Sequence, residues 1–586
     1  MYHRQGCRND AASLLLRRGE KKVEEQSIRY LIEGDSAVLM EFGHKITEEC
    51  NDQVQDMVQK IERGNLQGIR DLIPAFCTLM VCYDPSVWTT DALIDQLKAL
   101  QQVTVQAKKC RKRIVEIPVC YGGYFGPDLQ NVADHAGMTK EEVIAVHSRT
   151  PYRIYMLGFL PGFPYLGGLD ERLVTPRLAI PRTRIPAGSV GIGGSQTGIY
   201  PMASPGGWQL IGRTPLDIYD AKREEPFLYE AGDEIQFVPI DSDTYYEIRH
   251  QILRGTWKLT VREDVQEAKQ AHPTQSKQRA EGVQTTTVNE DAQIGGYLDI
   301  QTPGFFTTVQ DEGRLGYQRY GFSQSGVMDQ ASWKFGNALL HNPQDAAALE
   351  MTWQGASFTV DASTRIAVTG AECDVTIDGV KQPQNEALEI DPGRKVTIGI
   401  AKKGCRMYLC VQGGIQVPKV MGSRSLNLKC HIGGCEGRPL RAGDHVPFGV
   451  GADFYATETQ QTARTRLPEG DTVTLRVIPD AQAECFGTEG AQIFYSSEYE
   501  IAEESDRMGI RLQGPSVTGS GSADIVSEGI AFGAVQVPSS GCPIILMADR
   551  QTTGGYAKMG VVCSEDLSLL AQCRPGTKIR FARMEK

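Results

Sequence analysis

The sequence predicts a mainly β protein with α+β parts, and three observations support this fold class. Many short apolar runs separated by turn residues follow one another in the second half of the 586-residue chain, a pattern typical of strands in a barrel or sandwich. A few segments show apolar residues at helical spacing behind a capping residue. The 62 glycines and 29 prolines include one dense stretch that excludes regular helix.

That dense stretch runs from His147 to Pro215, and the rest of the chain is organised around it. Each proline fixes φ and each glycine permits a positive φ, so the composition predicts a shaped loop surface made of defined turns. Two interpretations stay open, a binding site that offers free backbone N–H groups and a proline-rich surface loop of a β-domain. The stretch differs from disordered sequence because it contains the aromatic residues Tyr155, Phe159, Phe163, Tyr165, Tyr200 and Trp208.

A small α+β subdomain is predicted over residues 27–112, after a basic extension over residues 1–26. The apolar part of the extension is a single run of three leucines, too short for the core of a signal peptide. The expected order in the subdomain is a strand within 28–42, a helix capped by Thr47, a strand over 76–83 and a helix capped by Thr90.

The next domain is predicted over residues 113–254 and contains strand patterns at both of its ends. Thr139 and Glu142 fit a capping box, so we expect a helix that ends at His147, where the glycine–proline stretch begins. Residues 255–295 are polar and offer little apolar surface to bury, which predicts a linker.

The last domain is predicted over residues 296–586 and consists mainly of short strands, as in a barrel or a sandwich. Asp329 is the expected cap of a helix, and residues 375–380 have the pattern of a hairpin. Glycine-rich polar segments return at 505–515 and 527–560. Each half of the chain is therefore expected to end in a β-domain decorated with polar turns.

Composition and charge restrict the class of partner. The chain carries 61 Lys and Arg against 72 Asp and Glu, a net charge of −11. This balance argues against a nucleic-acid or anionic-membrane surface, because both are bound through clustered cations. No apolar run is long enough to span a bilayer. We therefore expect a cytoplasmic protein that binds neither nucleic acid nor membrane, and a homo-oligomer is compatible with the sequence.

Fifteen cysteines are scattered without a repeating framework, which indicates reduced thiols. Cys430, His431 and Cys435 form the one cluster with a spacing near that of a zinc site. A second pair of ligands is missing, because Cys405 and Cys410 lie in an apparent strand at an odd separation and so face opposite sides. No bound metal is predicted, and the role of the Cys430 cluster stays open.

Several long motifs carry a resemblance to a known family. In the first half they are GFLPGFPYLGGLD (158–170), IPRTRIPAGSVGIGGSQTGIYP (180–201) and PGGWQLIGRTP (205–215). In the second half they are VQDEGRLGY (309–317), SGVMD (325–329), VQGGIQVPKVMGSRS (411–425), SDRMGIRLQGP (505–515) and DRQTTGGYAKMG (549–560). The first set resembles allophanate hydrolase subunit 1, which includes the 5-oxoprolinase B subunit. The second resembles allophanate hydrolase subunit 2, or the 5-oxoprolinase C subunit, so the chain looks like a fusion of the two.

The resemblance implies a cyclophilin-like β-barrel in each half, with the α+β subdomain before the first, and a carboxyltransferase-type last domain. It also implies an ATP-hydrolysing 5-oxoprolinase that opens the lactam 5-oxo-L-proline to L-glutamate together with a separate A subunit. Two alternatives stay open. One is the carboxyltransferase component of a urea or amide carboxylase, which would need biotin, and the other is an inhibitor of a sensor histidine kinase, the Kip type.

The sequence departs from the family pattern around residues 426–437, LNLKCHIGGCEG. The family usually has Thr where Leu426 stands, and it does not require the cysteines. The contribution of this loop to a shared site is therefore open.

No G-x-x-x-x-G-K-[ST] phosphate-binding loop occurs in the chain. ATP makes lactam hydrolysis feasible by phosphorylating the amide oxygen, so it is expected to bind with or through the partner subunit. Ala557-Lys558-Met559 resembles a biotinyl-lysine motif, but it lies inside DRQTTGGYAKMG, a motif of the C-subunit family that explains it better.

Opening a lactam that carries a carboxylate needs an anion anchor, activation of the amide oxygen and delivery of water. Arg182 lies among prolines, and its guanidinium suits a carboxylate or phosphate because it can donate two parallel hydrogen bonds. His147 suits proton transfer because its unperturbed pKa is about 6.5. A surface ion pair for Arg182 and a structural role for His147 are the alternatives.

Further candidates for substrate binding in the first half are a second arginine, turn residues with free N–H groups, and aromatic side chains. The alternatives are a tight turn for the glycines and core packing for the tryptophan. The candidates are Arg184, Gly193, Gly194, Ser195, Gln196, Thr197, Tyr200 and Trp208.

In the second half, polar residues beside glycine turns are the candidates, with Asp329 and Arg550 assigned to catalysis. Any two of these residues could instead pair with each other as buried structural ions. The candidates for substrate binding are Gln310, Asp311, Arg314, Asp506, Arg507, Gln551, Thr553 and Tyr556.

Overall fold

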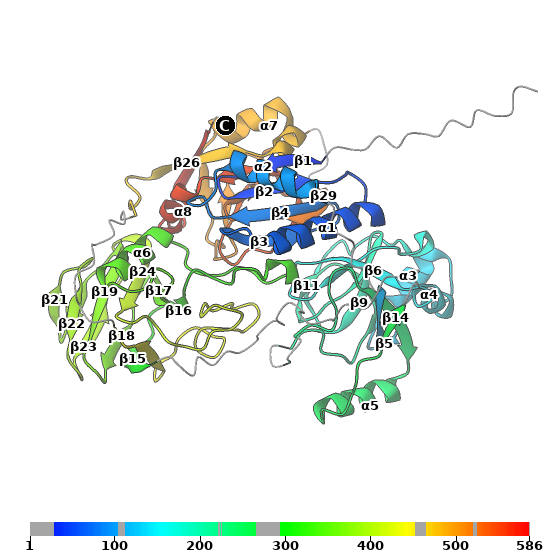
Figure 1. The fold of residues 1–586 in the computed structure, drawn as a ribbon, viewed down its shortest axis with the longest axis horizontal. Coiled ribbons are helices and arrows are strands. Elements are labelled where there is room, and N and C mark those ends of the chain that lie inside the picture. The colour runs from blue at the N-terminus through cyan, green and yellow to red at the C-terminus, as the bar shows by residue number, and fades with distance from the viewer. Residues whose placement is uncertain are drawn as a thin grey trace, which may run out of the picture.

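The computed structural model describes residues 28–103, 112–220, 223, 226–264, 293–451, 465–519 and 524–584. These residues form an α+β subdomain, a first β-barrel, a β-sandwich and a second β-barrel (Figure 1). The predicted mainly β fold class is confirmed, and both barrels close with seven strands. The predicted basic extension and most of the predicted linker lie outside the described residues.

The α+β subdomain is an antiparallel sheet with the strand order β1-β2-β4-β3 and two helices. Thr47 caps the first helix by accepting a hydrogen bond from the Cys50 N–H, as predicted, whereas the second helix is capped by Thr89 rather than Thr90. The elements are β1 Arg29–Ile32, β2 Ala37–Glu41, α1 Glu48–Gly64, β3 Ile69–Pro74, β4 Thr78–Tyr83 and α2 Thr90–Gln101.

Both faces of this sheet are buried, which explains why β2 is apolar over four consecutive residues. Val38 and Met40 face the two helices and pack in one core. Ala37 and Leu39 point to the opposite face, because side chains alternate along a strand, and pack against Ile530 and other residues of the second barrel. The α+β subdomain, which is the first folded part of the chain, therefore packs against the second barrel, which is the last.

The first barrel has the strand order β12-β9-β10-β7-β6-β13-β5 and closes by pairing β12 with β5. β14 also pairs with β5, so the structure continues past the predicted domain end at residue 254 into the segment predicted as linker. The strands are β5 Lys112–Tyr121, β6 Tyr152–Leu157, β7 Pro164–Leu166, β9 Ser189–Gly193, β10 Gln196–Ile199, β12 Gln209–Arg213, β13 Glu234–Ile240 and β14 Val261–Asp264.

Helices and a small sheet accompany this barrel. Thr139 and Glu142 form the predicted capping box, and the helix that they begin ends at His147. The elements are α3 Leu129–Ala136, α4 Lys140–His147, η1 Glu171–Leu173, α5 Ser242–Leu253 and the strand pair β8 Arg182–Ile185 and β11 Ser204–Gly206.

The stretch from His147 to Pro215 supplies five of the seven barrel strands, so its prediction as a loop surface is wrong. The glycines that suggested turns also make room for aromatic rings. A Cβ on Gly193, in β9, would lie 2.5 Å from the Trp208 ring, and one on Gly167 would lie 2.2 Å from the Tyr155 ring. Real Cβ atoms do not come so close, so these positions require glycine for packing.

The β-sandwich has two sheets, ordered β21-β20-β23-β18-β15-β25 and β16-β17-β24-β19-β22, which share one apolar core. The predicted hairpin over 375–380 is confirmed as β20 and β21. The strands are β15 Ile294–Thr302, β16 Phe306–Gln310, β17 Ala348–Thr352, β18 Ser357–Val360, β19 Thr364–Glu372, β20 Val375–Ile377, β21 Val380–Gln382, β22 Leu388–Ile390, β23 Lys395–Ile398, β24 Lys403–Val411 and β25 His445–Gly449.

A helix covers the outer face of the second sheet of the sandwich. This helix is α6, Gln330–Leu339, and Asp329 caps it as predicted, by accepting a 3.0 Å hydrogen bond from the Ser332 N–H. Trp333 packs with Tyr408 of β24 in a small apolar cluster. A short helical turn, η2 at Gln318–Tyr320, precedes α6.

The second barrel has the strand order β26-β33-β30-β31-β28-β27-β34 and is closed by a parallel pair, β26 with β34, as the first barrel contains the parallel pair β5 with β13. Its elements are β26 Thr472–Pro479, η3 Ala481–Phe486, α7 Gly487–Ser496, β27 Tyr499–Ile501, β28 Gly509–Gln513, β29 Asp524–Gly529, β30 Ala534–Gln536, β31 Ile544–Leu546, β32 Thr553–Tyr556, β33 Lys558–Val562, α8 Ser564–Ala571 and β34 Lys578–Arg583.

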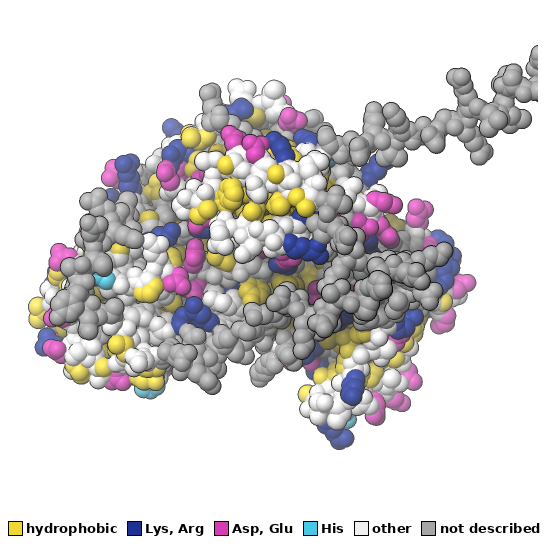
Figure 2. Space-filling view, in the orientation of Figure 1, with side chains coloured by type: hydrophobic (Ala, Val, Ile, Leu, Met, Phe, Trp, Pro, Cys, Tyr) yellow, Lys and Arg dark blue, Asp and Glu magenta, His cyan; other side chains and the backbone are white. Residues whose placement is uncertain are grey.

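Figure 1 shows the α+β subdomain (blue) against the second barrel (orange to red), with the first barrel and the sandwich on either side of them. Figure 2 shows Lys and Arg side chains dispersed among Asp and Glu side chains on the visible face. Among the described helices, none has the length and apolarity to cross a membrane.

A buried charge cluster joins the α+β subdomain to the second barrel. The Lys558 Nζ lies 2.8 Å from Glu33 Oε2, 2.7 Å from Glu528 Oε1 and 3.2 Å from Asp480 Oδ2. Lys558 is only 1% exposed. A lysine in this position is not accessible for biotinylation in the folded chain, so the biotinyl-lysine alternative for Ala557-Lys558-Met559 is not supported.

Candidate functional site

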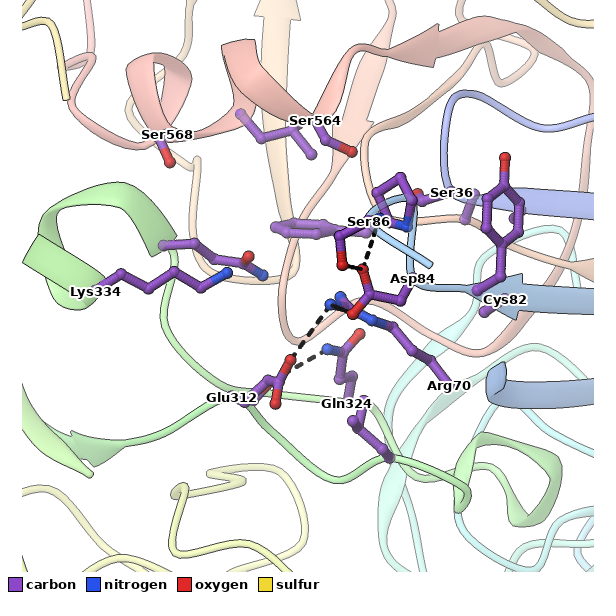
Figure 3. Close-up of a pocket in the computed structure, with 18 of the residues that line it drawn as sticks. Ser36, Arg70, Cys82, Asp84, Ser86, Glu312, Gln324, Lys334, Ser564 and Ser568 are labelled. Atoms are coloured by element: carbon purple, nitrogen blue, oxygen red, sulfur yellow. Dashed lines mark hydrogen bonds and ion pairs between the residues drawn. The ribbon is translucent and has the colours of Figure 1, made fainter. Parts of the chain in front are cut away.

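A polar cavity of about 600 Å³ lies where the α+β subdomain, the segment 312–345 and the second barrel meet (Figure 3). Both halves of the sequence therefore contribute to its wall. The polar lining residues are Ser36, Arg70, Asp84, Ser86, Glu312, Gln318, Gln324, Gln330, Lys334, Gln344, Asp345, Arg550, Ser564 and Ser568.

Arg70 bridges two parts of the cavity wall. Its Nη2 lies 2.9 Å from Asp84 Oδ2, at the end of β4, and 3.5 Å from Glu312 Oε1. Ser86 Oγ donates a 2.7 Å hydrogen bond to Asp84 Oδ1. Burial alone would raise the pKa of Asp84, but the hydrogen bonds from Ser86 and Arg70 lower it to about 2. Asp84 is thus a carboxylate at neutral pH, and Arg70 is held by two anions.

Lys334 supplies a cation that is not neutralised in this way. It lies on α6, one turn after Gln330, and Figure 3 shows its side chain extending into the cavity. Within the described ranges, no hydrogen bond or ion pair is formed by its Nζ. Lys334 is half-buried, so its charge faces the cavity rather than open solvent. The cavity therefore contains a positive charge free to bind an anion.

Gln318 is an amide of the cavity wall whose side-chain nitrogen and oxygen both have partners. Its Nε2 donates a 3.1 Å hydrogen bond to Asp71 Oδ2, and its Oε1 accepts a 3.2 Å hydrogen bond from Arg550 Nη2. Burial raises the pKa of Asp71 to about 6 and lowers that of Arg550 to about 10. Asp71 and Arg550 are both buried, and their hydrogen bonds hold the Gln318 amide in one orientation.

The composition of this wall suits a small molecule with an amide and a carboxylate. Amide side chains, among them Gln318, Gln324 and Gln330, can donate to a carbonyl and accept from an N–H. Lys334 can pair with a carboxylate or a phosphoryl oxygen. A few convergent polar groups in a concave site are typical of ligand-binding pockets.

The predicted second-half residues lie in the polar cavity, in a second cavity, or outside both. Arg550 lines the polar cavity, and Asp329 positions α6, which carries Lys334. Asp311 holds the loop 422–425 (GSRS) by accepting hydrogen bonds from Ser423 Oγ at 2.5 Å and Ser425 Oγ at 2.6 Å. Asp311 therefore has a clear structural role.

Arg314 is fully buried and donates to the Ser425 carbonyl. Thr553 is also buried, and its Oγ1 would lie 2.2 Å from a Cβ on Gly158 of the first half. Gln551 is half-buried beside it, and Tyr556 is 40% exposed. These residues lie outside the polar cavity.

Gln310, Asp506 and Arg507 line a second cavity of about 670 Å³, between the sandwich and the second barrel. Arg507 is strongly paired there, with its Nη1 2.5 Å from Glu350 Oε1 and its Nε 2.8 Å from Asp549 Oδ2. Arg507 therefore forms a buried ion pair, which is the structural alternative to substrate binding predicted from the sequence.

His147 lies inside the first barrel and is fully buried. Its Nδ1 and Nε2 lie 2.9 Å from Tyr121 Oη and from Thr197 Oγ1, and its ring stacks on Phe237. Burial lowers the pKa of His147 to about 3. This placement favours the structural alternative over proton transfer.

The buried His147 predicts an acid-dependent loss of stability. Its pKa in the folded state is about 3, below the value of about 6.5 in an unfolded chain, so only the unfolded state takes up this proton as pH falls through that window. The free energy of unfolding should then fall by up to about 1.4 kcal/mol per pH unit from this group. The His147→Gln variant should show a smaller loss of melting temperature between about pH 6.5 and pH 4.5.

The exposed His250 of α5 provides the control for this measurement. His250→Gln should keep the wild-type pH dependence. An equal pH dependence in His147→Gln and wild type would contradict the buried-neutral assignment.

Arg182 and Arg184 lie in β8, in the two-stranded sheet that β8 forms with β11. Arg182 Nη2 lies 2.7 Å from Asp128 Oδ1, and Arg182 is partly exposed, whereas Asp128 is buried. Arg184 is exposed. The ion pair is the structural alternative predicted for Arg182, and its anchoring role stays a prediction.

The glycine turn of the first half is a tight hairpin. Gly193 pairs with Gln196 in the β9–β10 ladder, so Gly194 and Ser195 form the two-residue turn. The Gly194 N–H already donates a 2.8 Å hydrogen bond to the Thr175 carbonyl, and its own carbonyl accepts from Thr175. Because the Gly194 N–H has a partner, the structure favours the tight turn, the alternative predicted for these glycines.

The remaining first-half candidates are core residues. Thr197 is buried and donates to the Gly191 carbonyl. Tyr200 and Trp208 are 2% and 6% exposed and pack edge-to-face around Phe163. This packing is the alternative predicted for Trp208, and none of the first-half candidates lines either cavity.

The GFLPGFP motif serves as a contact between the two halves. Gly162 N–H donates a 2.9 Å hydrogen bond to the Tyr320 carbonyl. Lys429 Nζ lies 3.3 Å from the Phe159 carbonyl oxygen and over its ring. The motif thus binds the second half of the same chain.

The cysteines of the loop 426–437 are largely shielded from solvent. Burial raises the pKa of Cys430 and of Cys435 to about 12, so both thiols stay protonated. No group of three or more His, Cys, Asp or Glu side chains suited to a metal occurs in the described part of the chain. Residues 426–429 of this loop line the second cavity.

The sequence did not single out Arg70, Asp84, Gln318 or Lys334 as site residues. Asp84-Pro85-Ser86 follows a predicted strand and resembles an ordinary turn. Lys334 resembles an exposed helix residue. Only the docking of the α+β subdomain on the second barrel brings these residues together, and no motif at these four positions indicates a site.

The matches to two family descriptions identify the chain as a carboxyltransferase-type protein. Residues 28–229 match the family described as Carboxyltransferase domain, subdomain C and D, and residues 320–583 match Carboxyltransferase domain, subdomain A and B. The chain belongs to the family of the 5-oxoprolinase B and C subunits, with both kinds of sequence in one polypeptide.

Each half has its own relatives. The chain is 43% identical over 238 residues to the 5-oxoprolinase B subunit of Bacillus subtilis (strain 168), covering 38% of this chain and 99% of that protein. It is 36% identical over 286 residues to the 5-oxoprolinase C subunit of Escherichia coli (strain K12), covering 49% of this chain and 91% of that protein. The crystal structure of TTHA0988 is similar over 93% of this chain and 99% of that one, with a TM-score of 0.77 and 32% identity.

Proposed function

We propose that the chain is the joined B and C part of an ATP-dependent 5-oxoprolinase and opens 5-oxo-L-proline to L-glutamate with a separate A subunit. The observation that carries this proposal is the polar cavity, because its wall comes from both the B-like and the C-like half. A site shared in this way explains why both kinds of sequence are needed together. Relatives of each half are named as 5-oxoprolinase subunits.

The cavity residues have roles that match this substrate. Lys334 would pair with the carboxylate of 5-oxoproline, and the fixed amide of Gln318 would hydrogen-bond the lactam. Arg550 and Asp71 position Gln318 from behind. Orienting a substrate in this way lowers the entropic part of the barrier.

ATP supplies the driving force for the reaction. Transfer of its terminal phosphoryl group to the lactam oxygen makes the ring carbon electrophilic, a water then adds, and the ring C–N bond breaks as the nitrogen takes up a proton. The resulting acyl phosphate is hydrolysed by a second water to glutamate and phosphate. Because the chain has no phosphate-binding loop of the P-loop type, we assign ATP binding to the A subunit or to its contact with this chain.

Reconstitution with a 5-oxoprolinase A subunit tests the proposal. The purified chain alone should form no glutamate from 5-oxoproline and ATP, whereas addition of the A subunit should give ATP-dependent glutamate formation. Glutamate and phosphate would be measured in the same reaction. Turnover by the chain alone would refute the requirement for the A subunit, and no turnover in a formed complex would refute the substrate.

A carboxyltransferase component of a urea or amide carboxylase is the second candidate, favoured by the family description of both halves. It would receive carboxybiotin from a carrier on another domain or protein, because Lys558 is buried among carboxylates. Transfer of the carboxyl group from free carboxybiotin to urea, without the A subunit, would select this candidate.

A further inference from the structure

The second cavity differs in character from the polar one. Its volume is about 670 Å³, and most of its lining is apolar. The sandwich contributes aromatic side chains, Phe305, Phe306 and Trp353, and the second barrel contributes Met508 and Ile510. Such a cavity suits a ligand with an apolar body.

Arg406 of β24 also lines this cavity and is 6% exposed. Its Nη1 donates to the Ala571 carbonyl, at the C-terminal end of α8, where a cation is favourable. Its Nε is buried and has no hydrogen-bond partner. Within the described residues, neither Nε nor Nη2 has a partner, and no carboxylate pairs with this guanidinium.

A buried guanidinium without a counter-ion is costly, because the charge loses its hydration and gains no opposite charge. The other ionised groups of this cavity do not relieve that cost. Asp549 is paired with Arg507, and Asp506 Oδ1 accepts from the Met508 and Gly509 N–H groups. Glu503 lies exposed at the rim, as does Lys429, which contacts the Phe159 carbonyl.

Trp353 lines the same cavity as Arg406. Its φ is +66°, a left-handed conformation that is uncommon for a bulky side chain. The guanidinium of Arg574 lies over its ring, 5.1 Å from the centroid. Strained residues of this kind often cluster where a ligand is clamped.

We propose that this cavity binds a small carboxylic acid with an apolar body, its carboxylate on the free nitrogens of Arg406 and its body against Trp353 and the apolar barrel wall. This site is separate from the polar cavity and does not depend on the 5-oxoprolinase proposal. A carboxylate fits Arg406 because a guanidinium offers parallel N–H donors. An apolar body fits because most of the surface that lines the cavity is apolar.

Phenylbutyrate and its uncharged analogue phenylbutanol test this proposal, because they share the apolar body and differ in the carboxylate. Isothermal titration calorimetry of the full chain should show phenylbutyrate binding about tenfold or more tightly than phenylbutanol. Arg406→Met should remove this preference and leave phenylbutanol binding. Arg511→Met, which removes an exposed arginine on β28 of the second barrel, should keep it.

A cavity-filling variant locates the binding independently of Arg406. Met508 is 37% exposed, so Met508→Trp should be tolerated by the fold while it fills the cavity and weakens both compounds. If thermal melting shows that Arg406→Met does not fold, binding of the two compounds to Met508→Trp still tests whether they occupy this cavity. Equal affinity of the two compounds, no binding of phenylbutyrate at about 10 mM, or unchanged binding to Met508→Trp would overturn the proposal.

Discussion

Lys558→Met is expected to separate the two halves of the chain once the connection between them is cut. Among the residues that the structure describes, Lys558 is the one cation paired with Glu33, Asp480 and Glu528, which are all buried. Although burial opposes its charge, these carboxylates raise the pKa of Lys558 well above its ordinary value. Removing it leaves buried carboxylates without a counter-charge, which typically costs about 3 to 5 kcal/mol.

The measurement uses a chain with a protease site engineered within residues 265–292. After cleavage, the wild-type halves should co-elute in gel filtration, because the α+β subdomain shares an apolar core with the second barrel and Asp35 accepts from the Ser564 N–H that begins α8. The Lys558→Met halves should elute separately or precipitate.

Lys578→Met is the matched control, since Lys578 lies on β34 of the same barrel in an exposed pair with Glu498. Its halves should stay together, because exposed ion pairs contribute little. Co-elution of the Lys558→Met halves with wild-type melting temperature would show that the cluster does not hold the two halves together.

Local features of the fold could be predicted from the sequence. The caps Thr47 and Asp329 and the box of Thr139 with Glu142 were predictable because capping is a local hydrogen-bond pattern. The barrels followed from motif resemblance. The stretch 147–215 was misjudged because a glycine that makes room for an aromatic ring has the same sequence signature as a glycine in a turn.

The candidate site was largely hidden from sequence reasoning. Arg550 was predicted, because it lies in a polar glycine-rich motif. Arg70 and Lys334 were not, because they become neighbours only when the first folded segment docks on the last. The apolar face of β2 contains a trace of that docking, since a strand apolar on both faces needs a partner for each.

Lys334→Met is expected to lower kcat/KM for glutamate formation by about a hundredfold in the complex with the A subunit, corresponding to about 3 kcal/mol. Lys334 is the cavity cation that has no partner among the described residues, so a substrate carboxylate would form a charge-assisted hydrogen bond with it. If that bond is equally strong in the ground and transition states, the loss should appear in KM with kcat nearly unchanged.

Two further variants separate binding from folding. Lys334→Arg keeps the charge and should recover part of the activity, and Lys381→Met, a 74% exposed lysine of the same sandwich, should keep all of it. Lys334→Met should fold normally, because Lys334 has no structural partner in the described chain to lose. Wild-type KM in a folded Lys334→Met complex would remove Lys334 from the site. A fall in melting temperature that accounts for the lost activity would assign it a structural role instead.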